Sequence, residues 1–429
     1  EARLANGIRV LVVEQRGLPI VAVDLAVDRG AEEAAPGVGS FAGAMLMRGT
    51  KTRSAIALSD ELAAIGASAD ASTDFDSVQI SSKCLTPHLG ELLAIVADVA
   101  EHPAFAKDEI ERERSRRLTA LAQQKDRPRT ILSNTIAELL YPAGSAYASP
   151  LLGDEAALKK IAAKDLAAFH AMRFTPDHVT IALAGDLDKA TAVAAVEKAF
   201  GKWKGPHTAT AVDTLTGAAH GGAPKILIVD RPGATQSSLS VVEVGVPRRS
   251  PDFDAITIMN TILGGQFSAR INMNLREAHA YTYGAFSSFD MRHHAGPFAI
   301  SGEIVREHTG EAVAEIMKEL ARIRDEPVSE EELADAKAHL IKQLPARFET
   351  VSATAATLAA LSVYGLPLDE FATRPARWAK ITREDVQRAA KAHLVPIAQH
   401  VVLVGDAKVV KAQLESLKLG DVVVRPAAK

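Results

Sequence analysis

Two side chains, Arg276 and Tyr283, lie seven residues apart (283 minus 276) and have types that could act on a peptide bond. An arginine guanidinium is a fixed fork of donors that can hold a backbone carbonyl or a carboxylate. A tyrosine hydroxyl can donate to the negative charge that develops on a scissile carbonyl oxygen, and loss of one such donor commonly costs about 10²–10³ in rate. Either residue alone is better explained structurally, as a surface ion pair or a half-buried strand aromatic. The functional interpretation therefore depends on the residues around them.

The surrounding sequence contains Gly-Gly-x-x-Ser-x-Arg at 264–270 and Leu-Arg-Glu at 275–277. This run resembles the C-terminal half of the M16 (pitrilysin-like, inverzincin) metallopeptidases, in which Leu-Arg-Glu-x-x-x-x-x-Tyr supplies an Arg and a Tyr that bind substrate. The resemblance implies catalytic roles for that Arg and Tyr and substrate contact at four residues, namely Arg276, Tyr283, Gly264 and Gly265. A plain helix C-cap would explain the two glycines equally well. Tyr281 is a second aromatic candidate in the same run.

A second segment, residues 37–50, resembles the zinc-binding helix of the same family, Gly-x-x-His-x-x-Glu-His-Met-Leu-x-x-Gly-Thr, but lacks its chemistry. Ser40 stands at the first His, Gly43 at the Glu that serves as general base, and Ala44 at the second His. The third family ligand, a Glu on a later helix, falls on Ala120. A catalytic zinc needs about three such ligands and a base for its bound water. The resemblance therefore implies a degenerate metal site and no metal in this chain.

Other residues that could hold a metal or act as a nucleophile are sparse. Glu113 matches an acidic residue of the family, but alone it cannot hold a metal. The 13 histidines include one adjacent pair, His293-His294, whose side chains should point to opposite sides of a strand. His279 occupies a variable position of the Arg/Tyr run. The single cysteine, Cys84, allows no intrachain disulfide and is expected to be a small buried hydrophobe.

The elements that must position these residues occur in two similar sets. A strand-like run ends in Gly185-Asp186, and a similar run ends in Gly405-Asp406, 220 residues later (405 minus 185). The acidic segment at 107–112 has a counterpart at 330–335, near the same offset. A shared offset in separate places indicates two copies of one fold.

Each half is predicted to be α+β, from alternating apolar residues in strands and apolar residues at helical spacing. In the first half, strands are expected at 8–14, 21–27 and 78–82, and helices at 41–47, 56–65, 88–101, 108–125 and 130–140. In the second half, strands are expected at 226–229 and 238–242, and helices at 252–263, 308–324, 329–343 and 352–364.

These patterns predict two homologous α+β halves, and the resemblance implies that the halves are α/β sandwiches of the LuxS/MPP-like metallohydrolase type, joined by a linker into a clamshell. The expected divisions are an N-terminal domain at 1–202, a linker rich in Gly, Ala, Thr, Pro and His at 203–224, and a C-terminal domain at 225–429. The strand at 66–73 matches a family edge strand that pairs with extended substrate in zinc-bearing halves. Without zinc beside it, only the strand itself is expected.

The bulk properties fit a globular protein with more than one domain. The chain has 429 residues, of which 47% are hydrophobic and 24% charged. Its net charge of -4 gives no sign of a polyanionic partner such as nucleic acid. No apolar run reaches the roughly 18 residues of a membrane-spanning helix. The chain begins at Glu1 without an apolar leader, as expected of a mature periplasmic protein after signal-peptide removal. A trimmed chain, or a cytoplasmic protein, is the alternative.

The leading hypothesis is the non-zinc subunit of a heterodimeric zinc metallopeptidase, inactive alone. A homologous partner with His-x-x-Glu-His would hold the zinc, and this chain would supply Arg276 and Tyr283 for hydrolysis of peptides. One alternative is an inactive scaffold or peptide-binding protein, like the core subunits of respiratory complex III. Another is a self-paired, inactive peptide-binding dimer. A neighbouring gene that encodes a similar chain with His-x-x-Glu-His would favour the first hypothesis.

Overall fold

The computed structural model describes residues 1–205 and 225–427, so most of the predicted linker lies outside the described residues. The described chain forms two compact units, and each takes segments from both halves of the sequence. The first unit contains Glu1–Leu121, Gln343–Glu370 and the described part of Ser149–Asp213. The second contains Ala122–Ala148 and the described parts of Thr214–Lys342 and Phe371–Lys429.

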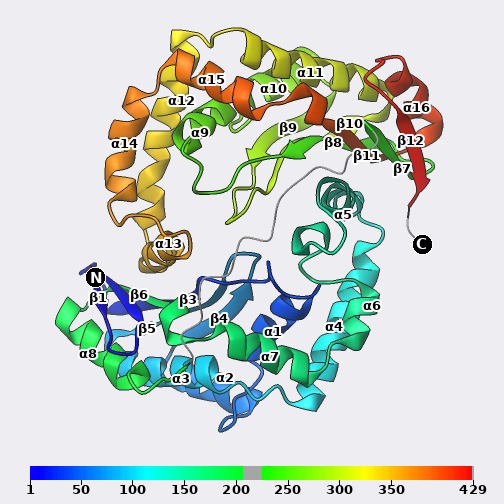
Figure 1. Ribbon diagram of the computed structural model, residues 1–429. Helices are drawn as coiled ribbons and strands as arrows, with labels where there is room; N and C mark the ends of the chain where they lie inside the picture. Colours follow the sequence, from blue (N-terminus) through cyan, green and yellow to red (C-terminus); the bar gives the residue numbers. More distant parts are fainter. Residues whose placement is uncertain (206–224, 428–429) are drawn as a thin grey trace. The chain divides into compact units, whose positions relative to one another are not determined.

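The first unit is built on a six-stranded sheet in which β2 and β6 are parallel and the other neighbours are antiparallel (Figure 1). The strand order is β1 (Ala2–Arg3), β2 (Arg9–Glu14), β6 (Val179–Gly185), β3 (Ile20–Val27), β5 (Val78–Leu85) and β4 (Ser68–Thr73). Almost every residue of β3 and β6 is buried, which is the pattern of strands covered on both faces.

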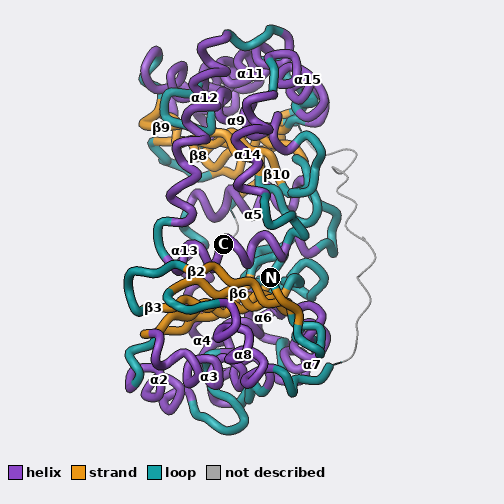
Figure 2. The backbone as a smooth tube through the Cα atoms, turned by 90° about the vertical axis from the view of Figure 1, so that its left-hand side faces the viewer, coloured by secondary structure: helices purple, strands orange, loops and turns teal. Residues whose placement is uncertain are grey.

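Helices supply the two covering layers of this sheet. They are α1 (Val38–Leu46), α2 (Ala55–Ala64), α3 (Leu89–Glu101), α4 (Lys107–Gln124, up to Leu121 in this unit), α6 (Glu155–Lys160), α7 (Ala163–Arg173), α8 (Lys189–Phe200) and α13 (Val351–Val363). On one face, α3 packs against β5 and α8 packs against β2. On the other face, α13 lies across β3 and β6, and Figure 2 shows these layers edge-on. Helix α13 begins at a Thr350 N-cap, whose hydroxyl accepts from the Ala353 amide.

The second unit repeats the order of five of these strands, while its sixth, β12, follows the others in sequence and is parallel to β7. Its sheet runs β12 (Val422–Pro426), β7 (Ile226–Asp230), β11 (His400–Gly405), β8 (Gln236–Val244), β10 (Pro297–Val305) and β9 (Thr282–Phe289). Strands β7 and β11 are parallel, as are β2 and β6 in the first unit. Its helices are α5 (Pro128–Leu140), α9 (Phe253–Leu263), α10 (Arg270–Asn272), α11 (Thr309–Asp325), α12 (Glu330–Gln343), α14 (Glu370–Lys380), α15 (Arg383–His393) and α16 (Ala407–Glu415).

The sheets confirm the predicted duplication and the α+β class. Gly185 ends β6 and Gly405 ends β11, at equivalent places in the two strand orders. One feature was not predicted: each sheet is covered by a helix from the other half of the sequence. Helix α5 comes from the first half of the sequence and packs on β8 and β11, while α13 comes from the second half and packs on the first sheet (Figure 1). The two compact units therefore differ from the predicted domains at 1–202 and 225–429, because each unit includes a helix from the other half. The predicted domain boundaries stay a prediction.

The predicted strands and helices are present, with ends shifted by a few residues. The helix expected at 41–47 is α1, Val38–Leu46, and the strand expected at 66–73 is β4, Ser68–Thr73, at an edge of its sheet. Among the described helices, none combines the length and the apolar character that crossing a bilayer requires.

Candidate functional site

The three degenerate positions of the zinc motif lie on α1 in the first unit, and a buried arginine is bonded to the first of them. The Ser40 hydroxyl donates to the Leu151 carbonyl at 2.6 Å. From α4, Arg117 donates through Nη1 to Ser40 Oγ at 3.0 Å and through Nη2 to the Ser40 carbonyl at 2.7 Å. The Arg117 side chain is only 5% exposed, and its guanidinium lies 4.8 Å from the centre of the Phe41 ring. A fixed cation therefore joins α1 to α4 at the first ligand position.

Glu113 neutralises this buried arginine. Its Oε1 accepts from Arg117 Nε at 2.7 Å, and Arg116 donates to both carboxylate oxygens from the solvent side. Burial alone would raise the pKa of Glu113, but the hydrogen bonds from the two arginines outweigh it and keep that pKa below its usual value. Glu113 is thus an ionised structural carboxylate, engaged by arginine and unavailable as a metal ligand.

The position of the family's general base is closed by packing. A Cβ atom on Gly43 would lie 1.9 Å from Oγ1 of Thr73, the last residue of β4. That Oγ1 is buried and has no hydrogen-bond partner. A glutamate at position 43 would therefore displace the Thr73 side chain. Ala44 and Ala120 offer no donor atom. The residues of this site therefore do not fit a zinc ion.

The predicted Arg and Tyr lie in the second unit, on either side of a short loop. Arg276 is on one turn of π-helix, Met273–Ala278, a feature that is frequent at functional sites. Its guanidinium lies 4.6 Å from the centre of the Phe267 ring and 3.2 Å from Glu277 Oε1. Tyr283 is the second residue of β9 and is 88% exposed. Both side chains are thus accessible, although no contact joins them to each other.

The two glycines of the predicted run have packing roles. Gly264 is the C-cap of α9, and a Cβ atom there would lie 2.6 Å from the Ser287 amide nitrogen of β9. A Cβ atom on Gly265 would lie 3.0 Å from the carbonyl oxygen of Asn260. Close approach of α9 to β9 therefore accounts for Gly264, and contact with the end of α9 accounts for Gly265, while substrate contact at both stays a prediction.

The other aromatic and histidine candidates are engaged elsewhere. The Tyr281 ring is stacked between His279 and His308, with ring centres 5.0 and 4.8 Å away. His294 is half-buried and lies edge-on to Tyr147, with ring centres 6.3 Å apart. Of the two tyrosines in the run, Tyr283 is the one whose ring is free for a ligand.

Tyr283 also lines a cavity of about 910 Å³, which the sequence did not predict. The cavity lies between one side of α5 and the faces of β8, β9 and β10, and we call it the α5 groove. Arg276 is not among its lining residues. No sequence signal could place α5 here, because residues 128–140 belong to the first half of the chain.

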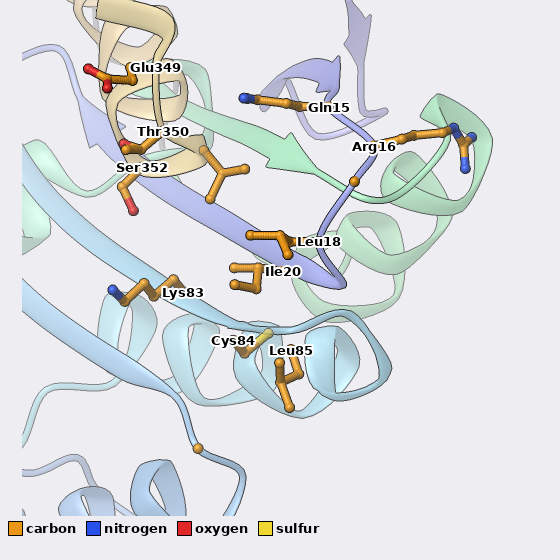
Figure 3. A pocket seen from close by; sticks show the side chains of 13 residues that line it. Gln15, Arg16, Leu18, Ile20, Lys83, Cys84, Leu85, Glu349, Thr350 and Ser352 are labelled. Atoms are coloured by element: carbon orange, nitrogen blue, oxygen red, sulfur yellow. The ribbon is translucent and has the colours of Figure 1, made fainter. Parts of the chain in front are cut away.

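A second cavity, of about 480 Å³, lies in the first unit and contains none of the predicted catalytic residues. Its walls come from the β2–β3 turn, the end of β5 and the start of α13. Figure 3 shows Leu18 and Ile20 between the start of α13 and Cys84. Cys84 is buried, as predicted, and burial raises the pKa of its thiol to about 11. A thiol with that pKa is a poor nucleophile near neutral pH.

Comparisons with known proteins agree with this architecture. Residues 9–155 match the family described as insulinase (peptidase family M16), and residues 160–340 match the peptidase M16 inactive domain. An uncharacterized zinc protease of Mycobacterium leprae is 25% identical over 79% of this chain and 76% of its own length. The uncharacterized zinc protease YmxG of Bacillus subtilis is 23% identical over 81% of this chain and 84% of its own length.

Solved structures show the same fold. The crystal structure of a peptidase M16 inactive domain from Pseudomonas fluorescens has a TM-score of 0.87 and 25% identity, and covers 100% of this chain and 99% of its own. A protease from Helicobacter pylori has a TM-score of 0.86 at 18% identity, and covers 94% of this chain and 98% of its own. The matched halves, the repeated sheet order and these structures together identify the chain as a member of peptidase family M16.

Proposed function

We propose that this chain is the non-zinc-binding subunit of a heterodimeric M16 zinc metallopeptidase. A homologous partner that carries His-x-x-Glu-His holds the zinc, and this chain supplies Arg276 and Tyr283 for peptide hydrolysis. The observation that carries the proposal is a contrast between the units. In the first, Arg117 and Thr73 occupy the space around the ligand positions, while in the second Tyr283 is 88% exposed at a large cavity.

Each residue has a role that follows from its chemistry. The Tyr283 hydroxyl donates to the substrate carbonyl oxygen as negative charge develops there. The Arg276 guanidinium holds a backbone carbonyl of the same peptide. Its present contacts, with the ring of Phe267 and the carboxylate of Glu277, are to exposed side chains that a substrate can displace. The chemistry of water activation belongs to the partner's zinc.

The test is peptide hydrolysis by this chain together with a homologous chain that carries His-x-x-Glu-His. We expect no zinc and no activity in this chain alone. In the complex, Tyr283→Phe should lower kcat/KM by about 10²–10³ without changing the zinc content, because one donor to the developing oxyanion is lost. Arg276→Ala should raise KM and lower kcat/KM, since substrate is held less well.

Tyr281→Phe is the matched control, because the Tyr281 ring is stacked between two histidines and should leave the rate unchanged. Full activity with both Arg276→Ala and Tyr283→Phe would instead identify the chain as an inactive scaffold or peptide-binding protein, the second candidate. That candidate is favoured by the match of residues 160–340 to the M16 inactive domain. Stoichiometric zinc in this chain alone would contradict both. A periplasmic location stays a prediction that cell fractionation tests.

A further inference from the structure

The floor of the α5 groove combines small or hydroxylated residues with Phe286 of β9, which is 46% exposed. Ser301 of β10 lies opposite Ser240 of β8, and their hydroxyls are 2.6 Å apart. On the other side of β10, Ala299 lies opposite Ser288 of β9. Because these side chains are short, the sheet leaves open the volume above it. Ser240 is buried, but Ser288 and Ser301 are exposed, and their hydroxyls can donate to or accept from the amides of a bound chain.

The wall of the groove is apolar and aromatic. Leu132 and Ile136 lie one helical turn apart on the side of α5 that lines the groove. At the end of α5, the Tyr141 ring meets the Tyr147 ring edge-on, with centres 5.4 Å apart. The Tyr141 hydroxyl donates to the Ala295 carbonyl, and both tyrosine rings are almost fully buried, so they support the wall from behind. Tyr283 stands at the β9 side of the lining.

The charged residues of the lining form two ion pairs. Arg129 Nε lies 2.8 Å from Glu303 Oε1, and Arg292 Nε donates to Asp290 Oδ2 at 2.9 Å. The groove therefore presents no net charge to a ligand. A charged side chain that entered it would have to compete with these pairs for a partner of opposite sign. The groove should select against charged segments.

The outer edge of β9 is partly covered by its own unit, which favours binding on the face of the sheet. The Ser287 amide donates to the Gly264 carbonyl at 3.0 Å, and the Ala285 amide donates to Asn272 Oδ1 at 3.3 Å. A peptide cannot use these two amides to extend the sheet. It can reach the hydroxyls of the floor and the wall of α5.

We propose that the α5 groove binds an extended, uncharged peptide segment with aromatic or branched aliphatic side chains. The proposal rests on the proposed peptidase function and gives its substrate class. A volume of about 910 Å³ lies within the usual range for ligand pockets and holds several side chains. The exposed hydroxyls of the floor bond the peptide backbone, and Ile136, Phe286 and Tyr283 pack against its apolar side chains. Tyr283 then connects the groove to the scissile bond.

The experiment measures binding of fluorescein-labelled decapeptides to this chain alone, by fluorescence anisotropy. One peptide contains Phe and Leu among Ala and Ser, and two others carry Asp or Lys in place of the apolar residues. Ser288→Trp fills the groove from an exposed position of β9. Ser72→Trp is the matched control in the first unit. Ser72 of β4 pairs with Gln79, as Ser288 of β9 pairs with Ala299. These two partners are 220 residues apart (299 minus 79), which is the offset of the duplication, so Ser72 is the equivalent of Ser288 in the first unit.

We expect Ser288→Trp to raise the Kd of the apolar peptide at least about tenfold, which corresponds to about 1.4 kcal/mol. Ser72→Trp should leave it unchanged, and the charged peptides should bind at least about tenfold more weakly. The proposal would be overturned if Ser288→Trp bound the apolar peptide with the wild-type Kd, or if Ser72→Trp weakened this binding equally. It would also be overturned if the charged peptides bound as tightly as the apolar one, or if no peptide bound. Circular dichroism confirms that both variants are folded. The binding experiment involves neither the partner nor hydrolysis. Its failure would refute the α5 groove proposal alone, whereas failure of the proposed function would show as unchanged activity of the Arg276 and Tyr283 variants in the complex.

Discussion

The two units share an order of strands and both bury charged groups, but they differ around the positions that the M16 resemblance marks. In the first unit, the Arg117–Glu113 pair is buried beside the first degenerate ligand position. In the second unit, Tyr283 is exposed at the α5 groove. A duplicated fold can thus keep its sheet while side chains close one copy at these positions and leave a cavity in the other. The sheet fixes where strands lie, and the side chains that fill the space between layers decide what the unit can do.

The largest effect is expected from Arg117→Ala, which tests how firmly the first unit is closed. This change leaves the Glu113 carboxylate buried with only Arg116, and breaking one side of a buried ion pair costs about 3–5 kcal/mol. Denaturant unfolding measures the loss. Arg116→Ala is the control, because that side chain is 64% exposed and should cost at most about 1 kcal/mol. Equal losses would mean that Arg117 does not hold α1 to α4.

A smaller effect is expected from Asp24→Asn, at a position where the two sheets differ. Asp24 of β3 lies opposite Ser81, which donates to it at 2.9 Å, and Ser240 occupies the equivalent place in β8. Burial raises the pKa of Asp24 to about 6, although the Ser81 hydrogen bond lowers it, and one carboxylate oxygen has no partner. The folded protein therefore binds this proton more tightly than the unfolded chain, whose aspartate has a pKa of about 3.9.

The raised pKa of Asp24 in the folded protein determines how the free energy of unfolding changes with pH. The contribution of Asp24 to stability is present below about pH 4 and is lost as the pH rises through about 6, by up to about 3 kcal/mol. Asp24→Asn should remove this slope and be the more stable protein at pH 7. Urea unfolding at pH 4, 5, 6 and 7 gives the difference between the two proteins. Asp70→Asn on β4, an exposed aspartate, is the control. A constant difference across this pH range would contradict the prediction.

The smallest effect is expected from Gly43→Ala, which probes the closed general-base position. The added Cβ would meet Thr73 Oγ1, and overpacking of this kind costs about 1–3 kcal/mol. Thr73→Ala in the same protein should recover much of the loss, because it removes the clashing hydroxyl. Gly90→Ala is the control, since a Cβ there meets open space and alanine favours the helix by up to about 1 kcal/mol. Additive effects of Gly43→Ala and Thr73→Ala would show that the two residues do not compete for space.

Much of the fold could be predicted because its signals are local. Helix α3 was expected at 88–101 and is Leu89–Glu101, since its apolar residues recur at helical spacing. The exchange of α5 and α13 could not be predicted, because a helix pattern shows which side is apolar but not which sheet covers it. The catalytic roles of Arg276 and Tyr283 stay a prediction, and the groove beside Tyr283 could not be predicted because it depends on α5, far away in the sequence.

The sequence by itself determined that no zinc ligands stand at positions 40, 44 and 120, that the fold is duplicated and that the Arg/Tyr run is intact. Ligand chemistry is a property of each side chain, and repetition is a property of their order. Only the tertiary structure decided that Arg117 reaches Ser40 across 77 residues of sequence, that Thr73 fills the space beside Gly43 and that α5 walls a groove over β8 to β10. These contacts depend on how separate elements pack, and packing brings together residues that no local pattern connects.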